Sequence, residues 1–158
     1  MSDLINRFKA TSMEHIIALA KPVLEEGRQV KFTVVGNSMF PVFRSNLDRV
    51  TLKKAEKVKK YDVVLYSHDD GNYVLHRIVG KGKLGYKLCG DNQHTVEYPV
   101  KRESVIAVMT AFERKGTEVS VNCVWYKLYC IMWCAFIPLR PFIFKIAFKI
   151  KKMFNRRK

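Results

Sequence analysis

Apolar and polar residues alternate with a period of two through the middle of the chain, from Val30 to about Asn122. This period places successive side chains on opposite faces of an extended strand, so it predicts a sheet. Turn-forming residues divide the segment into expected strands at 30–35, 49–54, 62–66, 73–79, 86–88, 104–112 and 118–121. The sequence Asp-Asp-Gly-Asn at 69–72 predicts a hairpin over 62–79. We expect a mainly β fold, a compact and partly closed antiparallel domain over 30–122.

The two flanking segments lack this alternation and are expected to be helical. Residues 1–29 carry apolar residues at helical spacing, which predicts a surface helix with its apolar stripe turned inward, kinked or ended at Pro22. Residues 123–158 are apolar at nearly every position as far as a Pro-Leu-Arg-Pro break, after which Phe and Ile alternate with Lys. The domain organisation is therefore an N-terminal helix, a β-rich domain and a C-terminal apolar and basic helical appendage.

The net charge of +15 is concentrated near the C-terminus, because nine lysines and arginines follow Glu118 and no acidic residue does. Only twelve apolar or uncharged residues lie between Lys127 and Arg140, whereas a spanning helix needs about 20. A basic amphipathic helix with aromatic residues is typical of the surface of an anionic membrane. We expect segment 123–158 to lie on, or insert shallowly into, the cytoplasmic face of a membrane. A helical hairpin packed on the domain or on a partner is one alternative. Nucleic-acid binding is another, which the many Phe and Ile residues disfavour.

The cysteines and the N-terminal residues indicate the redox compartment and whether a metal site or a targeting segment is expected. Cys89, Cys123, Cys130 and Cys134 form no CxxC pair and no Cys/His cluster with zinc spacing. We expect free thiols in a reducing compartment, and neither a metal nor a cofactor. Residues 1–21 have scattered charges and no apolar core, so we expect neither a secretory signal nor an anchor there.

A serine follows the run Val34-Val35-Gly36-Asn37 at the end of the first expected strand, and Met39, Phe40 and Pro41 come after it. Gly36 permits a tight turn that a Cβ would resist, and Pro41 prevents a helix from starting. The turn is therefore expected to present the Ser38 hydroxyl at a strand end. A serine is a weak nucleophile unless a base lies nearby.

His76 and Asp91 are the residues that could activate such a serine. His76 shares a strand face with Val74 and Ile78, so a neutral imidazole facing inward is expected, able to act as a base. A histidine in such a place is more often a core residue. Asp91 lies in a Gly-Asp-Asn turn, and its carboxylate could hold an imidazole by the ring N–H. A turn-forming role is the more common explanation for such an aspartate.

Four short motifs, in this order, resemble the successive boxes of type I signal peptidases, in particular the archaeal and endoplasmic-reticulum type with a histidine base. They are Ser38-Met39-Phe40-Pro41, Asp62-Val63-Val64, His76-Arg77-Ile78 and Gly90-Asp91-Asn92. The resemblance covers about residues 33–110. It implies a β-rich peptidase fold, with Ser38 as nucleophile, His76 as general base and Asp91 as the residue that orients it. It also implies extended peptide substrates with small residues before the cut, bound by strand addition.

The chain departs from this family at several positions. Gly36 stands where the family often has a serine whose hydroxyl helps to form the oxyanion hole. The Gly-x-Ser-Met pattern is closer to the related self-cleaving repressor peptidases. We therefore expect a hole of backbone N–H groups, chiefly that of Ser38, with Gly36 and Met39 as support. A second acidic residue usually follows Gly-Asp-Asn, and Glu97 is the nearest. Residues 1–29 do not resemble the family's membrane helix.

These features predict a serine endopeptidase that cleaves leader or signal-like peptides through an acyl-enzyme. Asp48 and Asp62 are expected to support the fold rather than the chemistry. A lysine base at Lys81, Lys83 or Lys87 is disfavoured, because these residues flank a glycine turn and lack an apolar surround. Two alternatives stay open: an inactive peptidase fold that binds a peptide or a membrane, and a self-cleaving regulator that binds nucleic acid.

Overall fold

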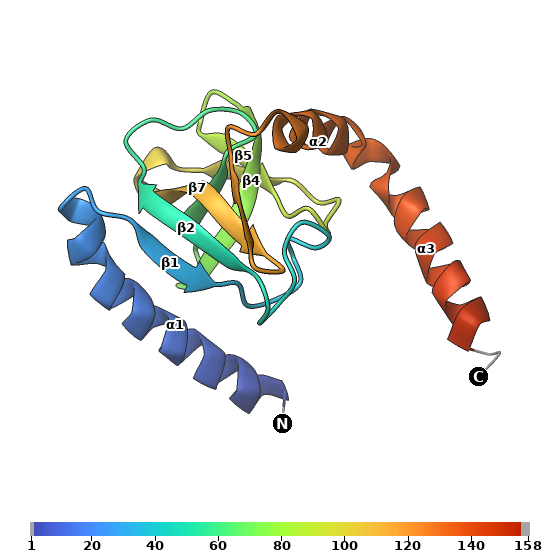
Figure 1. Cartoon of the computed structure of the whole chain (residues 1–158), viewed down its shortest axis with the longest axis horizontal. Coiled ribbons are helices and arrows are strands. Elements are labelled where there is room, and N and C mark those ends of the chain that lie inside the picture. Colours follow the sequence, from blue (N-terminus) through green and yellow to red (C-terminus); the bar gives the residue numbers. More distant parts are fainter. Residues whose placement is uncertain (1, 156–158) are drawn as a thin grey trace.

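The computed structural model describes residues 2–155, which form one eight-stranded antiparallel sheet with helices before and after it (Figure 1). The helices are α1 (Ser2–Glu25), α2 (Val124–Ala135) and α3 (Arg140–Asn155), and two short 3-10 helices are η1 (Arg102–Ser104) and η2 (Ile137–Leu139). The strands are β1 (Val30–Thr33), β2 (Arg49–Lys54), β3 (Val63–Ser67), β4 (Tyr73–Lys81), β5 (Tyr86–Cys89), β6 (Glu97–Val100), β7 (Val105–Arg114) and β8 (Thr117–Ser120).

The strand order is β1-β2-β7-β3-β4-β5-β6, with β8 paired to β7. Every pair is antiparallel. Among the described residues β1 and β6 end the path and do not pair with each other, so the sheet is not closed. The expected partial closure is therefore wrong. The class is mixed α/β rather than mainly β, because the α-helices hold more residues than the strands do.

The strands that the alternating pattern predicted all form, each with ends shifted by no more than two residues. The predicted hairpin over 62–79 is confirmed by the antiparallel pairing of β3 with β4, from Val63 opposite Arg77 to Ser67 opposite Tyr73. Strand β6 was missed. Its sequence, Glu-Tyr-Pro-Val, contains a proline and is too short to show alternation.

Helix α1 packs its inward face on the sheet, as the sequence predicted. Ile17, Ala20 and Leu24 are buried, and the helix contacts β1, β2 and β4. Pro22 does not end the helix, which continues to Glu25. One reason is that the turn after Pro22 carries Leu24, whose burial favours keeping that turn in place.

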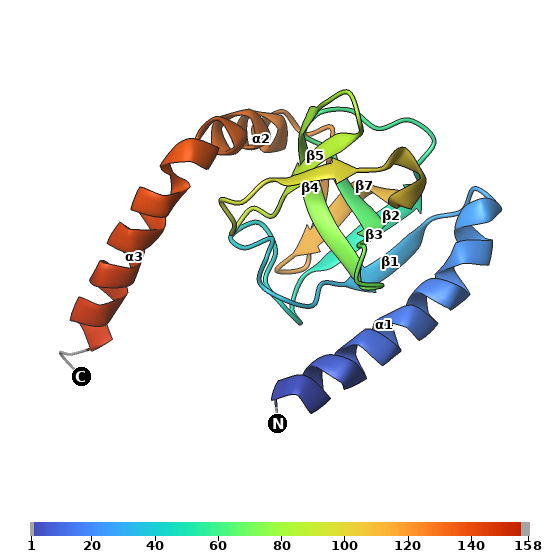
Figure 2. The same ribbon diagram turned by 180° about the vertical axis from the view of Figure 1, so that it is seen from behind.

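Both faces of the central strand β3 are buried. Val63 and Leu65 belong to the apolar cluster that also includes residues of α1 and α2, whereas Val64 and Tyr66 belong to a second cluster with residues of β4, β5 and β7. Helix α2 lies near β4 and β5 in both views, and α3 leads away from the sheet (Figures 1 and 2). Strand β4, which pairs with β3, therefore also has packing neighbours on both of its faces.

Candidate active site

The turn that carries Ser38 has the backbone that its sequence predicted. Gly36 has φ +93°, and a Cβ built there would have no atom within 4 Å, so the backbone conformation rather than space favours glycine. Met39 follows the serine and is buried in the apolar cluster, together with Val42 and Phe43. These side chains anchor the turn and leave Ser38 half-buried at its edge.

His76 lies on β4 and is only 3% exposed, as the strand pattern predicted. Its Nδ1 atom lies 3.0 Å from Glu97 Oε1 and 3.3 Å from the Tyr66 hydroxyl. The Tyr66 hydroxyl donates a hydrogen bond to Glu97 Oε2. The carboxylate of Glu97 is thus fixed between a phenol on β3 and an imidazole on β4, and it reaches both of them from the edge strand β6.

The contact with Glu97 determines which nitrogen of His76 can act as a base. An Nδ1–H that donates to the carboxylate leaves Nε2 with its lone pair. Within residues 2–155, Nε2 is buried and has no hydrogen-bond partner. Burial lowers the pKa of His76 below 6.5, although the Glu97 charge works in the opposite direction. The imidazole is therefore neutral at pH 7, and its free nitrogen can accept a proton.

Asp91 makes a different set of contacts from those that the sequence predicted. Both of its oxygens accept from Arg77, at 2.9 Å from Nε and 2.6 Å from Nη2, and both side chains are fully buried. Because neighbours on a strand face opposite sides, this ion pair forms on the face of β4 away from His76. The predicted contact between Asp91 and the imidazole is replaced by that of Glu97. The Asp91 charge still favours protonated His76.

The remaining donors of Arg77 are also occupied. Its Nη1 lies 3.0 Å from the Tyr61 carbonyl oxygen, 3.1 Å from the Tyr126 hydroxyl and 2.9 Å from Cys130 Sγ. Burial works to lower the pKa of Arg77, but the Asp91 carboxylate raises it well above its ordinary value. Arg77 and Asp91 therefore form a satisfied internal ion pair that links β4 to the turn after β5 and to α2.

The turn after β5 joins the serine to this centre. The Asn92 N–H donates to the Ser38 carbonyl oxygen at 2.7 Å. A Cβ on Gly90 would come within 2.6 Å of the same oxygen, so this close approach requires glycine. The serine turn is thus connected to the turn that carries Asp91, and through Asp91 to Arg77 on β4. No hydrogen bond links Ser38 Oγ to His76 Nε2 in the described part of the chain, and such bonds are often long in enzymes without substrate.

Backbone N–H groups near the serine are candidates for an oxyanion hole. The Gly36 N–H donates to Ser45 Oγ at 3.0 Å, so Gly36 shapes the turn and its N–H is occupied. For the N–H groups of Ser38 and Met39, the structure of residues 2–155 provides no acceptor. These two donors are therefore available to a developing negative charge.

The C-terminal helices also hold the turn after β5, through hydrogen bonds from Arg140 and Trp133 to its carbonyl oxygens. Arg140 is fully buried, and its Nη1 donates to the carbonyl oxygens of Gly90 and Gln93 at 2.9 and 2.7 Å. Its Nη2 donates to the Trp133 carbonyl at 3.0 Å, and Trp133 Nε1 donates to the Asp91 carbonyl at 2.9 Å. In the sequence, Arg140 is interpreted only as a charge that interrupts an apolar run. In the structure it links the appendage to the centre of the domain.

The other acidic residues singled out in the sequence act locally. Asp48 is buried and pairs with Arg44, whose hydrogen bonds lower the pKa of the carboxyl. Asp62 accepts from the Lys59 N–H at 2.9 Å, and burial raises its pKa. Among the described residues, no group of three His, Cys, Asp or Glu side chains is placed to hold a metal, and all four cysteines are free.

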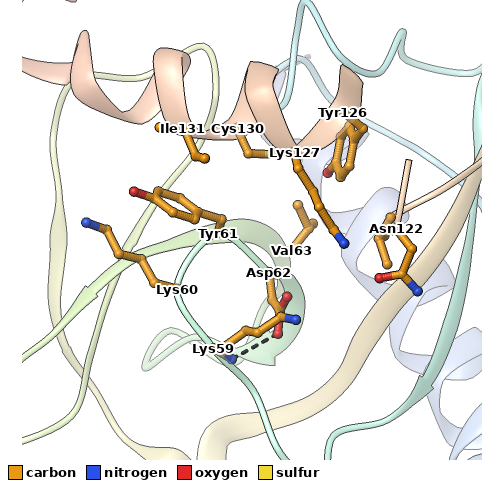
Figure 3. Close-up of a pocket in the computed structure, with 11 residues that line it drawn as sticks. Lys59, Lys60, Tyr61, Asp62, Val63, Asn122, Tyr126, Lys127, Cys130 and Ile131 are labelled. Atoms are coloured by element: carbon orange, nitrogen blue, oxygen red, sulfur yellow. Dashed lines mark hydrogen bonds between the residues drawn. The ribbon is translucent and has the colours of Figure 1, made fainter. Parts of the chain in front are cut away.

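A cavity of about 360 Å³ lies between α2 and the loop before β3 (Figure 3). Its walls include Tyr61, Tyr126 and Cys130, which are also contacts of Arg77. The cavity therefore belongs to the Arg77 side of the sheet and not to the His76 side. Lys59, Lys60 and Lys127 stand around it, with Asp62 as the one carboxylate in its lining.

Comparison with models of known protein families gives no match for this chain, and comparison with curated proteins gives no relative.

Proposed function

We propose that the protein is a serine endopeptidase in which Ser38 is the nucleophile, His76 the general base and Glu97 the residue that orients the base. One observation carries the proposal. A buried neutral imidazole has one nitrogen on a carboxylate and the other without a partner among the described residues, and the turn that follows β5 is hydrogen-bonded to the turn that holds the serine. An unsatisfied buried acceptor is costly. Its retention here supports a role that needs the free nitrogen.

In the proposed reaction, His76 Nε2 takes the proton from Ser38 Oγ as the oxygen attacks the carbonyl carbon of the scissile bond. The Glu97 carboxylate stabilises the imidazolium that forms. The N–H groups of Ser38 and Met39 stabilise the tetrahedral oxyanion, and each such donor can contribute about 3 kcal/mol. Collapse of this intermediate breaks the C–N bond, and Nε2–H protonates the leaving amine. Water, activated by the same nitrogen, then hydrolyses the acyl-enzyme.

The proposed substrates are leader or signal-like peptides that are cut after small residues. This part of the proposal rests on the resemblance of the four motifs to type I signal peptidases. It is compatible with the sheet, because β1 and β6 each have one side without a paired strand among the described residues. An extended peptide can add to such an edge through main-chain hydrogen bonds. Glu97 lies on β6 itself, so a peptide bound there would be close to the proposed base.

The test is to incubate wild-type protein and the Ser38→Ala variant with a peptide library and to sequence the products. We expect cleavage by wild type and loss of cleavage in Ser38→Ala and His76→Ala, with circular dichroism spectra and melting temperatures preserved in Ser38→Ala. Full activity in Ser38→Ala would refute the assignment of the nucleophile.

One observation favours a second candidate function, a peptide-binding module without catalysis. The described structure contains no hydrogen bond between Ser38 Oγ and His76 Nε2, and Gly36 supplies no hydroxyl to an oxyanion hole. Binding of library peptides by wild type, with no cleavage of any of them at pH 6 to 9, would support this second function over the first.

A further inference from the structure

The outward face of α2 is apolar, which is unusual for a helix on a protein surface. Its inward face packs on the domain through Tyr126 and Cys130. The rest of the helix surface carries five exposed apolar side chains, of which Ile131 also borders the cavity beside α2: Val124, Trp125, Leu128, Ile131 and Met132. Trp125 is 80% exposed. A surface helix of a soluble domain normally turns polar residues to solvent, so this face is suited to an apolar environment.

The same apolar character continues past the bend into α3. Phe136 and Leu139 are exposed at the bend, and Phe142, Ile146 and Met153 are exposed along α3. Lysines accompany them, with Lys145 and Lys149 exposed on α3 and Lys127 on the flank of α2. We call these exposed apolar residues and lysines of α2, η2 and α3 the C-terminal face. It combines apolar side chains with positive charge, and no carboxylate lies in the sequence after Glu118.

The geometry of the C-terminal face favours lying on a surface over crossing a bilayer. Among the described residues no single helix has the length and apolar composition to span a membrane. The helices Val124–Ala135 and Ile137–Ile146 have that length and apolar composition only when they are taken together, and the pair is bent by 55°. Buried Arg140, at the start of α3, donates to the Trp133 carbonyl oxygen of α2 and to the Gly90 carbonyl oxygen of the turn after β5, so it fixes the bend against the domain. Straightening the pair into one span would break these bonds.

We propose that the C-terminal face docks on an anionic lipid bilayer, with α2 and α3 in the interfacial plane. Its apolar side chains would enter the boundary between headgroups and acyl chains, and its lysines would meet lipid phosphates. Lys59 and Lys60 add positive charge nearby, at the cavity beside α2, where Asp62 is the only carboxylate in the lining (Figure 3). This docking goes beyond the proposed peptidase activity and does not depend on it.

Charge distinguishes a bilayer from the other possible occupants. A second copy of the chain would bring one strongly basic surface against another, since each chain carries a net charge of +15. Nucleic acid would satisfy the lysines but would leave the Trp125, Leu128 and Ile131 side chains without apolar partners. An anionic bilayer satisfies both the charge and the apolar area.

The experiment measures sedimentation of the full-length Ser38→Ala protein with vesicles, so that loss of peptidase activity cannot affect the result. The vesicles contain equal parts of phosphatidylcholine and phosphatidylglycerol, or phosphatidylcholine alone. We expect binding to the anionic vesicles and much weaker binding to the neutral ones. The triple substitution Trp125→Ser, Leu128→Ser and Ile131→Ser should weaken binding by about 30-fold or more.

A matched control removes three exposed apolar side chains elsewhere, Leu19→Ser, Leu47→Ser and Leu84→Ser, each more exposed than Leu128 or Ile131, and should leave vesicle binding unchanged. The substitutions Lys127→Gln, Lys145→Gln and Lys149→Gln should weaken binding about tenfold or more, whereas Lys83→Gln, Lys101→Gln and Lys115→Gln should have a smaller effect. All of these side chains are exposed, so the folded state should be kept in each variant.

Three results would overturn the proposal. The first is no binding of the otherwise unsubstituted Ser38→Ala protein to anionic vesicles. The second is equal binding by the α2 triple variant and its matched control. The third is self-association or DNA binding that requires Trp125, Leu128 and Ile131 in the absence of vesicle binding. Each of these can occur whether or not wild-type protein cleaves peptides, so failure of the docking proposal is distinguishable from failure of the peptidase proposal.

Discussion

His76 and Arg77 are neighbours on β4 and face opposite sides of the sheet. Their side-chain nitrogens differ in whether they have hydrogen-bond partners. Every donor group of Arg77 has a partner among Asp91, Tyr61, Tyr126 and Cys130. His76 has one nitrogen held by Glu97 and the other buried without a partner. The Arg77 side therefore fixes the turn after β5, and we propose that the free nitrogen on the His76 side takes part in chemistry.

The largest expected effect is on the rate of peptide cleavage and comes from removing the charge of Glu97 beside His76. Glu97→Gln removes the charge that would stabilise an imidazolium, and under the proposed mechanism it should lower kcat for peptide cleavage by about 10⁴-fold, the loss seen when a Ser-His-Asp triad loses the charge of its carboxylate. Steady-state kinetics measures this effect. A residual activity close to wild type would show that Glu97 does not act through His76.

The next largest effect is on stability and comes from breaking the Arg77 side. Asp91→Asn leaves the buried guanidinium without its counter-charge, which should lower the free energy of unfolding by about 3–5 kcal/mol. Urea denaturation measures this change. If Asp91→Asn instead kept full stability and lost activity as completely as Glu97→Gln does, the orienting role would return to Asp91.

Arg140→Met tests whether the C-terminal helices support the same turn. The carbonyl oxygens of Gly90, Gln93 and Trp133 would lose their donor, and we expect a loss of about 2–3 kcal/mol in the free energy of unfolding. Because the turn also bonds to the Ser38 carbonyl oxygen, kcat should fall while KM changes less. Arg140→Lys, which keeps the charge, is the matched control and should recover part of both.

The smallest effect is the pH dependence of His76. Its pKa in the folded protein lies below 6.5 because of burial, so kcat/KM should hold down to pH 6.5 and fall as the pH drops through that lowered value. Protonation also favours the unfolded chain there, so stability should decrease in the same direction. Glu97→Gln removes a charge that raises this pKa, and its residual activity should therefore fall at a lower pH than that of wild type. A shift to higher pH would contradict the contact.

The parts of the fold that local pattern determines were predictable from the sequence. The alternating strands, the β3–β4 hairpin, the turn at Gly36 and the inward face of His76 all follow from spacing and turn chemistry. The features that the sequence did not predict depend on contacts between segments that are distant along the chain. Strand β6 has too few residues to show a pattern, and missing it left the contact of Glu97 with His76 unseen. Arg77 was expected to face away from His76, and it does. Its burial could not be expected, because α2 covers that side of the sheet.

We propose that Ser38 is a nucleophile activated by His76. The most direct test of this proposal is the intact mass of the protein, quenched during turnover of a cleavable peptide or ester, with the modified residue located by peptide mapping. We expect an acyl adduct on Ser38 in wild type that is absent in His76→Ala. Substrate turnover with no adduct on Ser38, or equal acylation in His76→Ala, would contradict it.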